Sequence, residues 1–168
     1  MAYHETRHYG LDTKMQGCLL TGNALERHEP LNPLPPVGAF ERWGIDIIGR
    51  LPITKQNNKW IITAIDYATK YPITRAVQEA TTVEIGKFIY EEILTRFVCP
   101  IEVLTDRGAN FSANVLEEYL KECKIKHLLT SAYHPRSNGA VERFNGFFGK
   151  MLTKFCNGHI NKWDEYID

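Results

Sequence analysis

The sequence lacks several features that mark specialised classes of protein. None of its apolar runs approaches the roughly 18 residues of a membrane-spanning helix, and no signal peptide is visible at Met1. Its four cysteines are far apart and form no Cys-x-x-Cys pair, which favours reduced thiols in an intracellular compartment over a disulfide framework. It has neither internal repeats nor low-complexity runs. We therefore expect no membrane partner and one core of ordinary size.

The chain also lacks an excess of charge of either sign. Lys and Arg number 20, and Asp and Glu also number 20, so the formal net charge is zero. A protein that binds nucleic acid through electrostatics alone is usually clearly basic, so this balance argues against that class. This objection does not hold at a site where a cluster of acids binds two divalent cations. The bound ions would give that site a positive charge, which attracts phosphate.

The first residues carry an incomplete set of zinc ligands. His4 and His8 form a His-x3-His pair and Cys18 follows, but Thr21 stands where a second cysteine is needed. Two histidines and one thiolate leave the tetrahedron a ligand short. We expect no zinc here, and we interpret residues 1–21 as a degenerate remnant of an N-terminal zinc-binding region or a flexible arm.

A proline-rich stretch separates these residues from the rest of the chain. Residues 22–41 contain four prolines and few apolar side chains, which predicts an extended linker. The pattern is dense from there on. Apolar runs predict strands at 43–49, 59–66 and 71–77, joined by short turns as an antiparallel meander. We place one domain at 42–168 and expect its C-terminal end to be truncated.

Helices and strands then alternate. Thr81 opens a Thr-x-x-Glu capping box for a helix that we expect to end near Cys99–Pro100. Strands are predicted at 101–105 and 125–129, with a helix between them that we expect Ser112 to cap. The spacing of apolar residues predicts which side chains of these two helices point into the core. They are Ile85, Phe88, Ile89, Ile93 and Phe97 for the first helix, and Val115, Leu116, Tyr119, Leu120 and Cys123 for the second.

The last helix is predicted to begin near residues 138–140 and to carry a row of apolar side chains. The order β-β-β-α-β-α-β-α predicts an α/β fold with a mixed five-stranded sheet flanked by helices. We expect the following side chains of the last helix to point inward: Phe144, Phe147, Phe148, Met151, Leu152 and Phe155.

One carboxylate stands in the middle of the first strand, within the apolar run 43–49. An unpaired buried charge costs several kcal/mol, and no Lys or Arg lies beside Asp46, so a metal ion shared with other acids would explain it. Asp106 follows the fourth strand, where α/β sheets place their ligands, and Glu142 lies in the first turn of the last helix. The alternative, an Asp satisfied by backbone amides or an Arg, stays open. Asp66 is interpreted as a turn-forming residue.

Three segments together resemble the integrase catalytic core of retroviruses and long-terminal-repeat retrotransposons, most closely the Ty3/gypsy type. They are Trp-Gly-Ile-Asp at 43–46, Leu-Thr-Asp-Arg-Gly-Ala-Asn-Phe at 104–111 and His-Pro-Arg-Ser-Asn-Gly-Ala-Val-Glu-Arg-Phe-Asn at 134–145. Between Asp106 and Glu142 lie 35 residues, which is the spacing of the family's D,D-35-E acids. The resemblance implies a ribonuclease-H-like fold.

The resemblance also implies a reaction. Asp46, Asp106 and Glu142 would be the catalytic residues and would bind two Mg²⁺ or Mn²⁺ ions. The 3′-hydroxyl of retroelement DNA would attack a phosphodiester of target DNA, and water in its place would trim the element ends. The implied partners are element-end DNA, target DNA and further copies of the chain in a homodimer or higher oligomer. The implied location is the nucleus, on chromosomal DNA, reached through a cytoplasmic particle.

Further side chains of the matching segments are expected to contact DNA. Lys150 is the preferred contact for element-end DNA, because it lies eight residues after Glu142, near the same helical face. Asn110 and Asn138 have a second interpretation, which is to orient the carboxylates, and His134 has one as a structural turn. Gly108 and Gly139 are expected to allow close approach of the backbone to DNA or a turn with positive φ. The expected DNA contacts are Arg107, Asn110, His134, Arg136, Asn138, Arg143, Asn145 and Lys150.

Two other functions remain open. A domesticated or truncated integrase-derived domain could keep the fold and act as a DNA- or protein-binding module, which the degenerate zinc region and the neutral charge favour. A ribonuclease-H-like nuclease that cuts RNA–DNA hybrids would share the fold. The position of Glu142 on a late helix, within His-Pro-x-Ser-Asn-Gly-x-x-Glu, argues against the nuclease.

Overall fold

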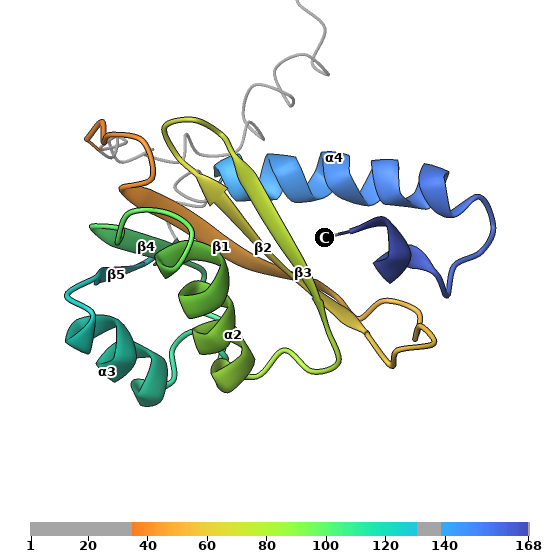
Figure 1. Ribbon diagram of the computed structural model, residues 1–168, viewed down its shortest axis with the longest axis horizontal. Coiled ribbons are helices and arrows are strands. Elements are labelled where there is room, and N and C mark those ends of the chain that lie inside the picture. Colours follow the sequence, from red (N-terminus) through yellow and green to blue (C-terminus); the bar gives the residue numbers. More distant parts are fainter. Residues whose placement is uncertain (1–34, 131–138, 168) are drawn as a thin grey trace, which may run out of the picture. The chain divides into compact units, whose positions relative to one another are not determined.

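The structure is a computed structural model that describes residues 35–130 and 139–167 (Figure 1). The chain divides into two units, Met1–Asn32 and Pro33–Asp168, and all described residues fall in the second. The predicted zinc remnant at 1–21 and most of the predicted linker lie outside the described residues.

Five strands form one mixed sheet, as the sequence predicts. Its order is β3-β2-β1-β4-β5, in which β1 pairs with β2 and β2 with β3 in antiparallel fashion, while β1–β4 and β4–β5 are parallel. The strands are β1 (Arg42–Gly49), β2 (Trp60–Asp66), β3 (Pro72–Val77), β4 (Glu102–Thr105) and β5 (Lys126–Leu129).

Helices cover both faces of this sheet. Figure 1 shows α4 on the opposite side of the strands from α2 and α3. Within residues 35–130 and 139–167, none of the helices has the length and hydropathy needed to cross a membrane. The helical segments are α2 (Thr82–Phe88), the π-helix η1 (Ile89–Leu94), α3 (Asn114–Glu122), α4 (Gly139–Cys156) and the 3₁₀ turn η3 (Trp163–Tyr166).

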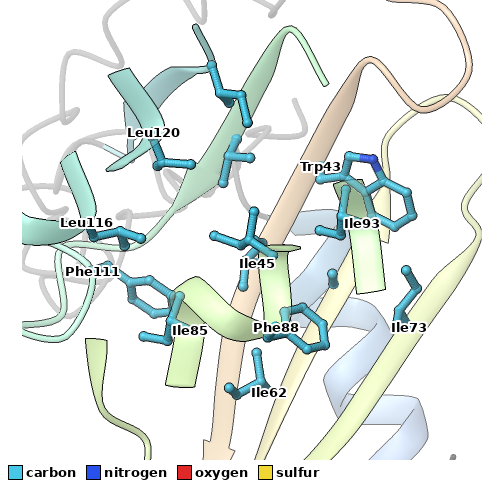
Figure 2. Close-up of a cluster of buried hydrophobic side chains, with 14 of the residues drawn as sticks. Trp43, Ile45, Ile62, Ile73, Ile85, Phe88, Ile93, Phe111, Leu116 and Leu120 are labelled. Atoms are coloured by element: carbon cyan, nitrogen blue, oxygen red, sulfur yellow. The ribbon is translucent and has the colours of Figure 1, made fainter. Parts of the chain in front are cut away.

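Strand alternation divides the apolar side chains between two clusters. Ile45 and Ile47 of β1 face α2 and α3, in the main core, which Figure 2 shows. Ile48 faces α4, in a smaller cluster with Phe148 and Leu152. Successive side chains of a strand point to opposite faces of the sheet. Asp46 therefore lies on the α4 face, although its neighbours Ile45 and Ile47 point into the main core. The sheet therefore separates its largest apolar cluster from the face that carries Asp46.

The predicted capping of α2 is confirmed, because the Thr81 hydroxyl accepts the Glu84 N–H at 3.2 Å. Four of the five expected inward side chains of this helix are fully buried, and Phe97 is partly buried. The helix ends at Leu94 and not near Cys99–Pro100. At this end the Thr95 hydroxyl donates to the Glu91 carbonyl at 2.5 Å.

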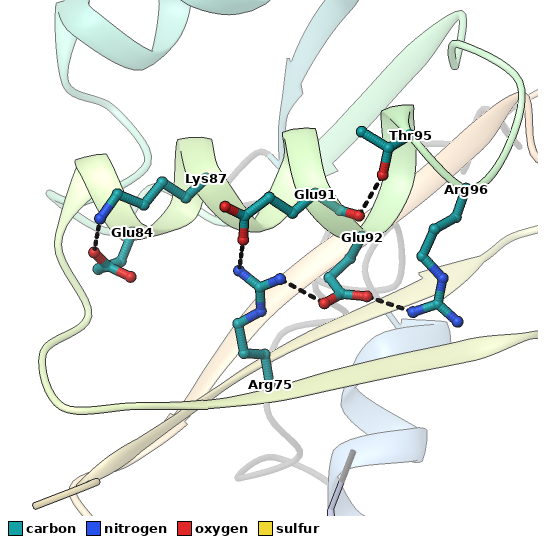
Figure 3. Close-up of polar contacts among 7 residues, drawn as sticks. All are labelled: Arg75, Glu84, Lys87, Glu91, Glu92, Thr95 and Arg96. Carbon is teal, nitrogen blue, oxygen red and sulfur yellow. Dashed lines mark hydrogen bonds and ion pairs between the residues drawn. The ribbon is translucent and has the colours of Figure 1, made fainter.

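Ion pairs join η1 to the edge strand β3 (Figure 3). The Arg75 guanidinium of β3 binds Glu91 at 2.7 Å and Glu92 at 2.5 Å, and Glu92 also pairs with Arg96. An isolated exposed pair contributes at most about 1 kcal/mol, but here one guanidinium and one carboxylate are each shared. The network fixes the outer end of the helix to the sheet.

Two expectations about the later helices are wrong. Ser112 does not cap α3, because Ala113 is the N-cap residue and the Ser112 hydroxyl donates to the Gly108 carbonyl at 3.2 Å. The Val115 side chain is 65% exposed and so is not part of the inward face. Local pattern favours both assignments, but the Ser112 hydroxyl is used in the Gly108 turn, and Val115 lines an open pocket between α2 and α3.

The aromatic row of α4 is only partly inward. Phe148 and Leu152 are buried as expected, and Phe144 and Met151 pack against them. Phe147 and Phe155 are 68% and 58% exposed, so their predicted burial is wrong. Phe147 is rotated by about 100° from Phe148 around the helix axis, away from the sheet. Phe155 stacks on Tyr166 of η3, with ring centroids 6.3 Å apart.

Candidate active site

Asp46 lies in β1, and Asp106 directly follows β4, the parallel strand beside it. In the β1–β4 register, Arg42 pairs with Glu102 and Gly44 with Leu104, so each residue of β4 lies 60 positions after its partner in β1. Asp106 follows Asp46 by the same 60 positions. Extending this register brings the two acids level, with Asp106 just past the carboxyl end of β4. The local sequence indicates which strand each acid belongs to or follows. Only the β1–β4 register shows that the two acids are close to one another in space.

A side-chain amide from α4 fixes the Asp46 carboxylate. The Asn145 Nδ2 donates to Asp46 Oδ2 at 2.8 Å, and the Ile47 N–H donates to Oδ1 at 2.8 Å. The Thr63 hydroxyl lies 3.0 Å from Asn145 Oδ1 and 3.2 Å from the Asp46 carbonyl oxygen, and Thr63 is also the β2 partner of Asp46 in the sheet. One amide therefore connects α4 to both central strands at the point where Asp46 lies.

Glu142 stands one helical turn before Asn145, exposed at the start of α4. Burial raises the pKa of the Asp46 carboxyl, and the charges of Asp106 and then Glu142 raise it further, while the hydrogen bonds from Ile47 and Asn145 oppose the rise. The three acids thus share one electrostatic neighbourhood. In this arrangement, no three His, Cys, Asp or Glu side chains among the described residues lie close enough together to hold a metal ion.

The backbone beyond β4 wraps closely around Asp106. The Gly108 N–H donates to Asp106 Oδ1 at 2.8 Å, and a Cβ added to Gly108 would lie 2.9 Å from the same oxygen, closer than real Cβ atoms come. Glycine allows this approach to the Asp106 carboxylate, whereas the expected approach to DNA stays a prediction. The expected positive φ is wrong, because neither Gly108 nor Gly139 has one. The Thr105 hydroxyl donates to the Asp106 carbonyl at 3.0 Å and lies 2.9 Å from His127 Nε2. Asp106 is held by local contacts on both sides.

The residues that we expect to contact DNA fall into three groups. Arg107, Asn110, Arg143 and Lys150 are exposed, and Arg107 donates to the Thr130 carbonyl at 3.0 Å. Asn145 differs, because its amide is bound to Asp46 and Thr63. The remaining three expected DNA contacts lie outside the described residues: His134, Arg136 and Asn138.

Thr63 and Tyr67 are neighbours of the acids that sequence reasoning missed. Thr63 is the one polar residue inside the apolar run of β2, and that anomaly was the available signal. Tyr67 follows β2, and burial raises the pKa of its hydroxyl to about 12, with Arg42 opposing and Glu142 adding to the rise. The neighbouring Asp66 is the turn residue that we expected, since its Oδ2 accepts the Thr69 N–H and hydroxyl, each at 2.7 Å.

Raising the pH is expected to shift the relative stability of the metal-free protein in favour of Asp46→Asn over wild type. The pKa of Asp46 is higher in the folded than in the unfolded chain, so ionisation costs the folded state free energy. This cost is absent below the unfolded pKa, about 4, and is complete once the pH exceeds the folded pKa. The difference in Tm between Asp46→Asn and wild type, measured in EDTA, should therefore grow with pH and then level off.

A matched control for this measurement is Glu118→Gln, which removes an exposed acid of α3. Its Tm is measured across the same pH range and shows how much of any effect comes from removing one acidic side chain. A difference for Asp46→Asn that is independent of pH would contradict the assignment of a raised pKa to Asp46.

Comparison with known families matches the chain to the integrase core domain over residues 36–135, a range that includes Asp46 and Asp106 and ends before Glu142. The Pro-Pol polyprotein of Simian foamy virus type 3 is 31% identical over 159 residues, which cover 89% of this chain and 13% of that protein.

Two transposon polyproteins are similar over most of the same range. The retrovirus-related Pol polyprotein from transposon 412 of Drosophila melanogaster is 25% identical over 132 residues, covering 79% of this chain and 11% of that protein. The transposon Tf2-3 polyprotein of Schizosaccharomyces pombe is 22% identical over 149 residues, covering 86% and 11%. The chain thus spans between 11% and 13% of the length of these three relatives.

Proposed function

The chain belongs to the integrase core domain family, and from that membership we propose that it joins the 3′ ends of retroelement DNA to target DNA by phosphoryl transfer. The observation that carries the proposal is the placement of the acids. Asp46 lies in β1, Asp106 directly follows the neighbouring parallel strand β4, and the charge of Glu142 in α4 raises the pKa of Asp46. The acids are thus contributed by three elements and act on one another.

We propose that Asp46, Asp106 and Glu142 are catalytic and bind two Mg²⁺ or Mn²⁺ ions. Carboxylate oxygens are the hard donors that these cations prefer. The mutual repulsion that raises the pKa of Asp46 supports the proposal, because a bound cation would relieve it. Two such ions supply activation of the attacking hydroxyl and stabilisation of the leaving oxygen.

The protein's own residues have separate proposed tasks. Asn145 holds one oxygen of Asp46 and so fixes the direction of the carboxylate, while Gly108 allows the backbone to hold Asp106. Arg107, Arg143 and Lys150 are exposed cations available to DNA phosphates. His134, Arg136, Asn138 and Asn110 stay predicted DNA contacts. Assembly into a homodimer or higher oligomer and action in the nucleus belong to the same proposal and rest on the family alone.

The test is strand transfer or its reversal on a branched oligonucleotide in Mn²⁺, with the joined or released strand quantified on a denaturing gel. We expect product in Mn²⁺ and none in EDTA. Absence of product from folded protein with every branched and linear substrate would overturn the proposal. An RNA–DNA hybrid of the same sequence serves as a further substrate, and its cleavage in preference to DNA joining would favour the ribonuclease-H-like nuclease.

A second candidate function is a DNA-binding module derived from an integrase. The observation that favours it is that the acids, within the part of the chain that the structure describes, do not form a metal-holding group. Isothermal titration with Mn²⁺ discriminates the two functions. Heat that disappears in the carboxylate variants indicates the enzyme, whereas DNA binding with no carboxylate-dependent metal binding indicates the module.

A further inference from the structure

An apolar cavity of about 170 Å³ lies between α4, the central strands and η3. We call it the α4 cavity. Its volume is close to that of engineered protein cavities of about 150 Å³ that admit benzene or xenon. Six of the residues that line it are Ile48, Ile61, Phe148, Leu152, Cys156 and Trp163.

The α4 cavity continues the face of the sheet that carries Asp46. Ile48 is two residues after Asp46 in β1, so both side chains point to the same side of the sheet. Phe148 follows Asn145 by three residues on α4, which places the two on one helical face. The residues that fix Asp46 and those that line the cavity therefore lie side by side on the same two elements.

Hydrogen bonds close the end of the cavity next to η3. The Trp163 indole N–H donates to the Pro52 carbonyl at 2.7 Å. Asp164 Oδ2 accepts the Thr54 hydroxyl at 2.6 Å and the Asn58 side-chain amide at 2.9 Å. These contacts attach η3 to the β1–β2 connection, so the part of the wall that η3 forms is held in place by the protein's own hydrogen bonds.

The walls of the α4 cavity offer almost no polar group to a ligand. The Thr153 hydroxyl donates to the Gly149 carbonyl of its own helix at 2.8 Å, and the Trp163 N–H is bound to Pro52. The Cys156 thiol is a weak donor, and burial raises its pKa, so it stays uncharged at neutral pH. A polar ligand would lose its hydration here without compensation, which selects an apolar one.

We propose that the α4 cavity is a binding site for a small aromatic molecule of one or two fused rings, and that its occupation shifts α4 and with it the contact between Asn145 and Asp46. The cavity volume sets the size of the ligand, and the composition of the walls sets its chemistry. The binding site itself does not rest on the proposed DNA-joining activity, because it is argued from the cavity alone.

The experiment is an NMR titration of the full chain with indole. Binding should shift the methyl signals of Ile48, Ile61 and Leu152 in a saturable way, and the side-chain amide signals of Asn145 should shift with the same dissociation constant. Unchanged methyl signals would overturn the proposed site. Methyl shifts without any Asn145 response would overturn the coupling to Asp46.

Two glycines of α4 provide matched variants. A Cβ added at Gly149 or at Gly146 meets nothing within 4 Å, but only Gly149 lines the cavity. Gly149→Leu should weaken indole binding by at least about tenfold, because the leucine side chain fills the site. Gly146→Leu makes the same gain in helix propensity and should bind as wild type does.

If Gly149→Leu does not fold, a second variant that fills the α4 cavity tests whether indole binds there. Cys156→Met adds volume from another position of the same wall, and folding of every variant is checked by signal dispersion before titration. Equal indole affinity in wild type and in either folded filling variant would contradict the site. Because this readout is binding, inactivity of the protein in DNA joining would leave the result unaffected.

Discussion

Replacing Asp46 or Asp106 with Asn, or Glu142 with Gln, is expected to reduce strand transfer by at least about a thousandfold. Each change removes one negative charge and keeps the size of the side chain. Metal-assisted phosphoryl transfer depends on that charge, because the amide oxygen is a weaker ligand and leaves the developing charge uncompensated. The measurement is the initial rate of joined product in Mn²⁺, with each variant shown to be folded by circular dichroism.

The control variant for this series is Glu118→Gln, which removes a solvent-exposed acid from α3, on the opposite side of the sheet from α4. It should keep the wild-type rate. Equal activity of wild type and all three carboxylate variants would end the assignment of Asp46, Asp106 and Glu142. A loss in Asp46→Asn and Asp106→Asn with none in Glu142→Gln would remove Glu142 alone from the site.

Truncating Glu102 to Ala is expected to reduce the free energy of unfolding by about 3–5 kcal/mol. Glu102 pairs with Arg42 where β1 and β4 meet, and the two residues are 7% and 3% exposed. The Arg42 guanidinium also donates to the Pro35 carbonyl at 2.9 Å. Without Glu102, a buried positive charge would keep only neutral partners. Chemical denaturation, with the midpoint and slope compared with wild type, measures the loss.

The matched control is Glu79→Ala, since Glu79 pairs with Lys59 but its side chain is 62% exposed. Its loss should be below about 1 kcal/mol. The double replacement Arg42→Met with Glu102→Leu should recover most of the stability, because an apolar pair leaves no buried charge. If Glu102→Ala and Glu79→Ala cost the same, the Arg42–Glu102 pair contributes no more than a surface pair.

The strands and helices can be predicted from the sequence because the buried side of each element requires apolar residues at a characteristic spacing. The apolar run around Asp46 in β1 and the spacing of Ile85 and Phe88 in α2 are visible in the sequence and agree with the structure. Ser112 shows the limit of such reasoning. Its hydroxyl had two acceptable uses, a helix cap or a bond to Gly108, and only the course of the backbone selects the second.

The sequence predicts which residues form the candidate site, but it does not predict the contacts between them. Asp46, Asp106 and Glu142 stand out in the sequence through context and spacing, whereas their mutual placement depends on the strand register and the docking of α4. Asn145 illustrates the difference. It was expected to contact DNA, but its amide is occupied by Asp46 and Thr63, a relation between three separate elements that no local period encodes.

The two outer strands of the sheet have a consequence for self-association. Strand β3 begins with Pro72, which has no N–H, and its Arg75 is tied to η1, while β5 has only four residues and starts with Lys126. Short, charged or proline-containing margins are poor templates for recruiting another strand. Neighbouring copies should therefore not extend this sheet into a continuous ribbon, and their contacts should form through the helices.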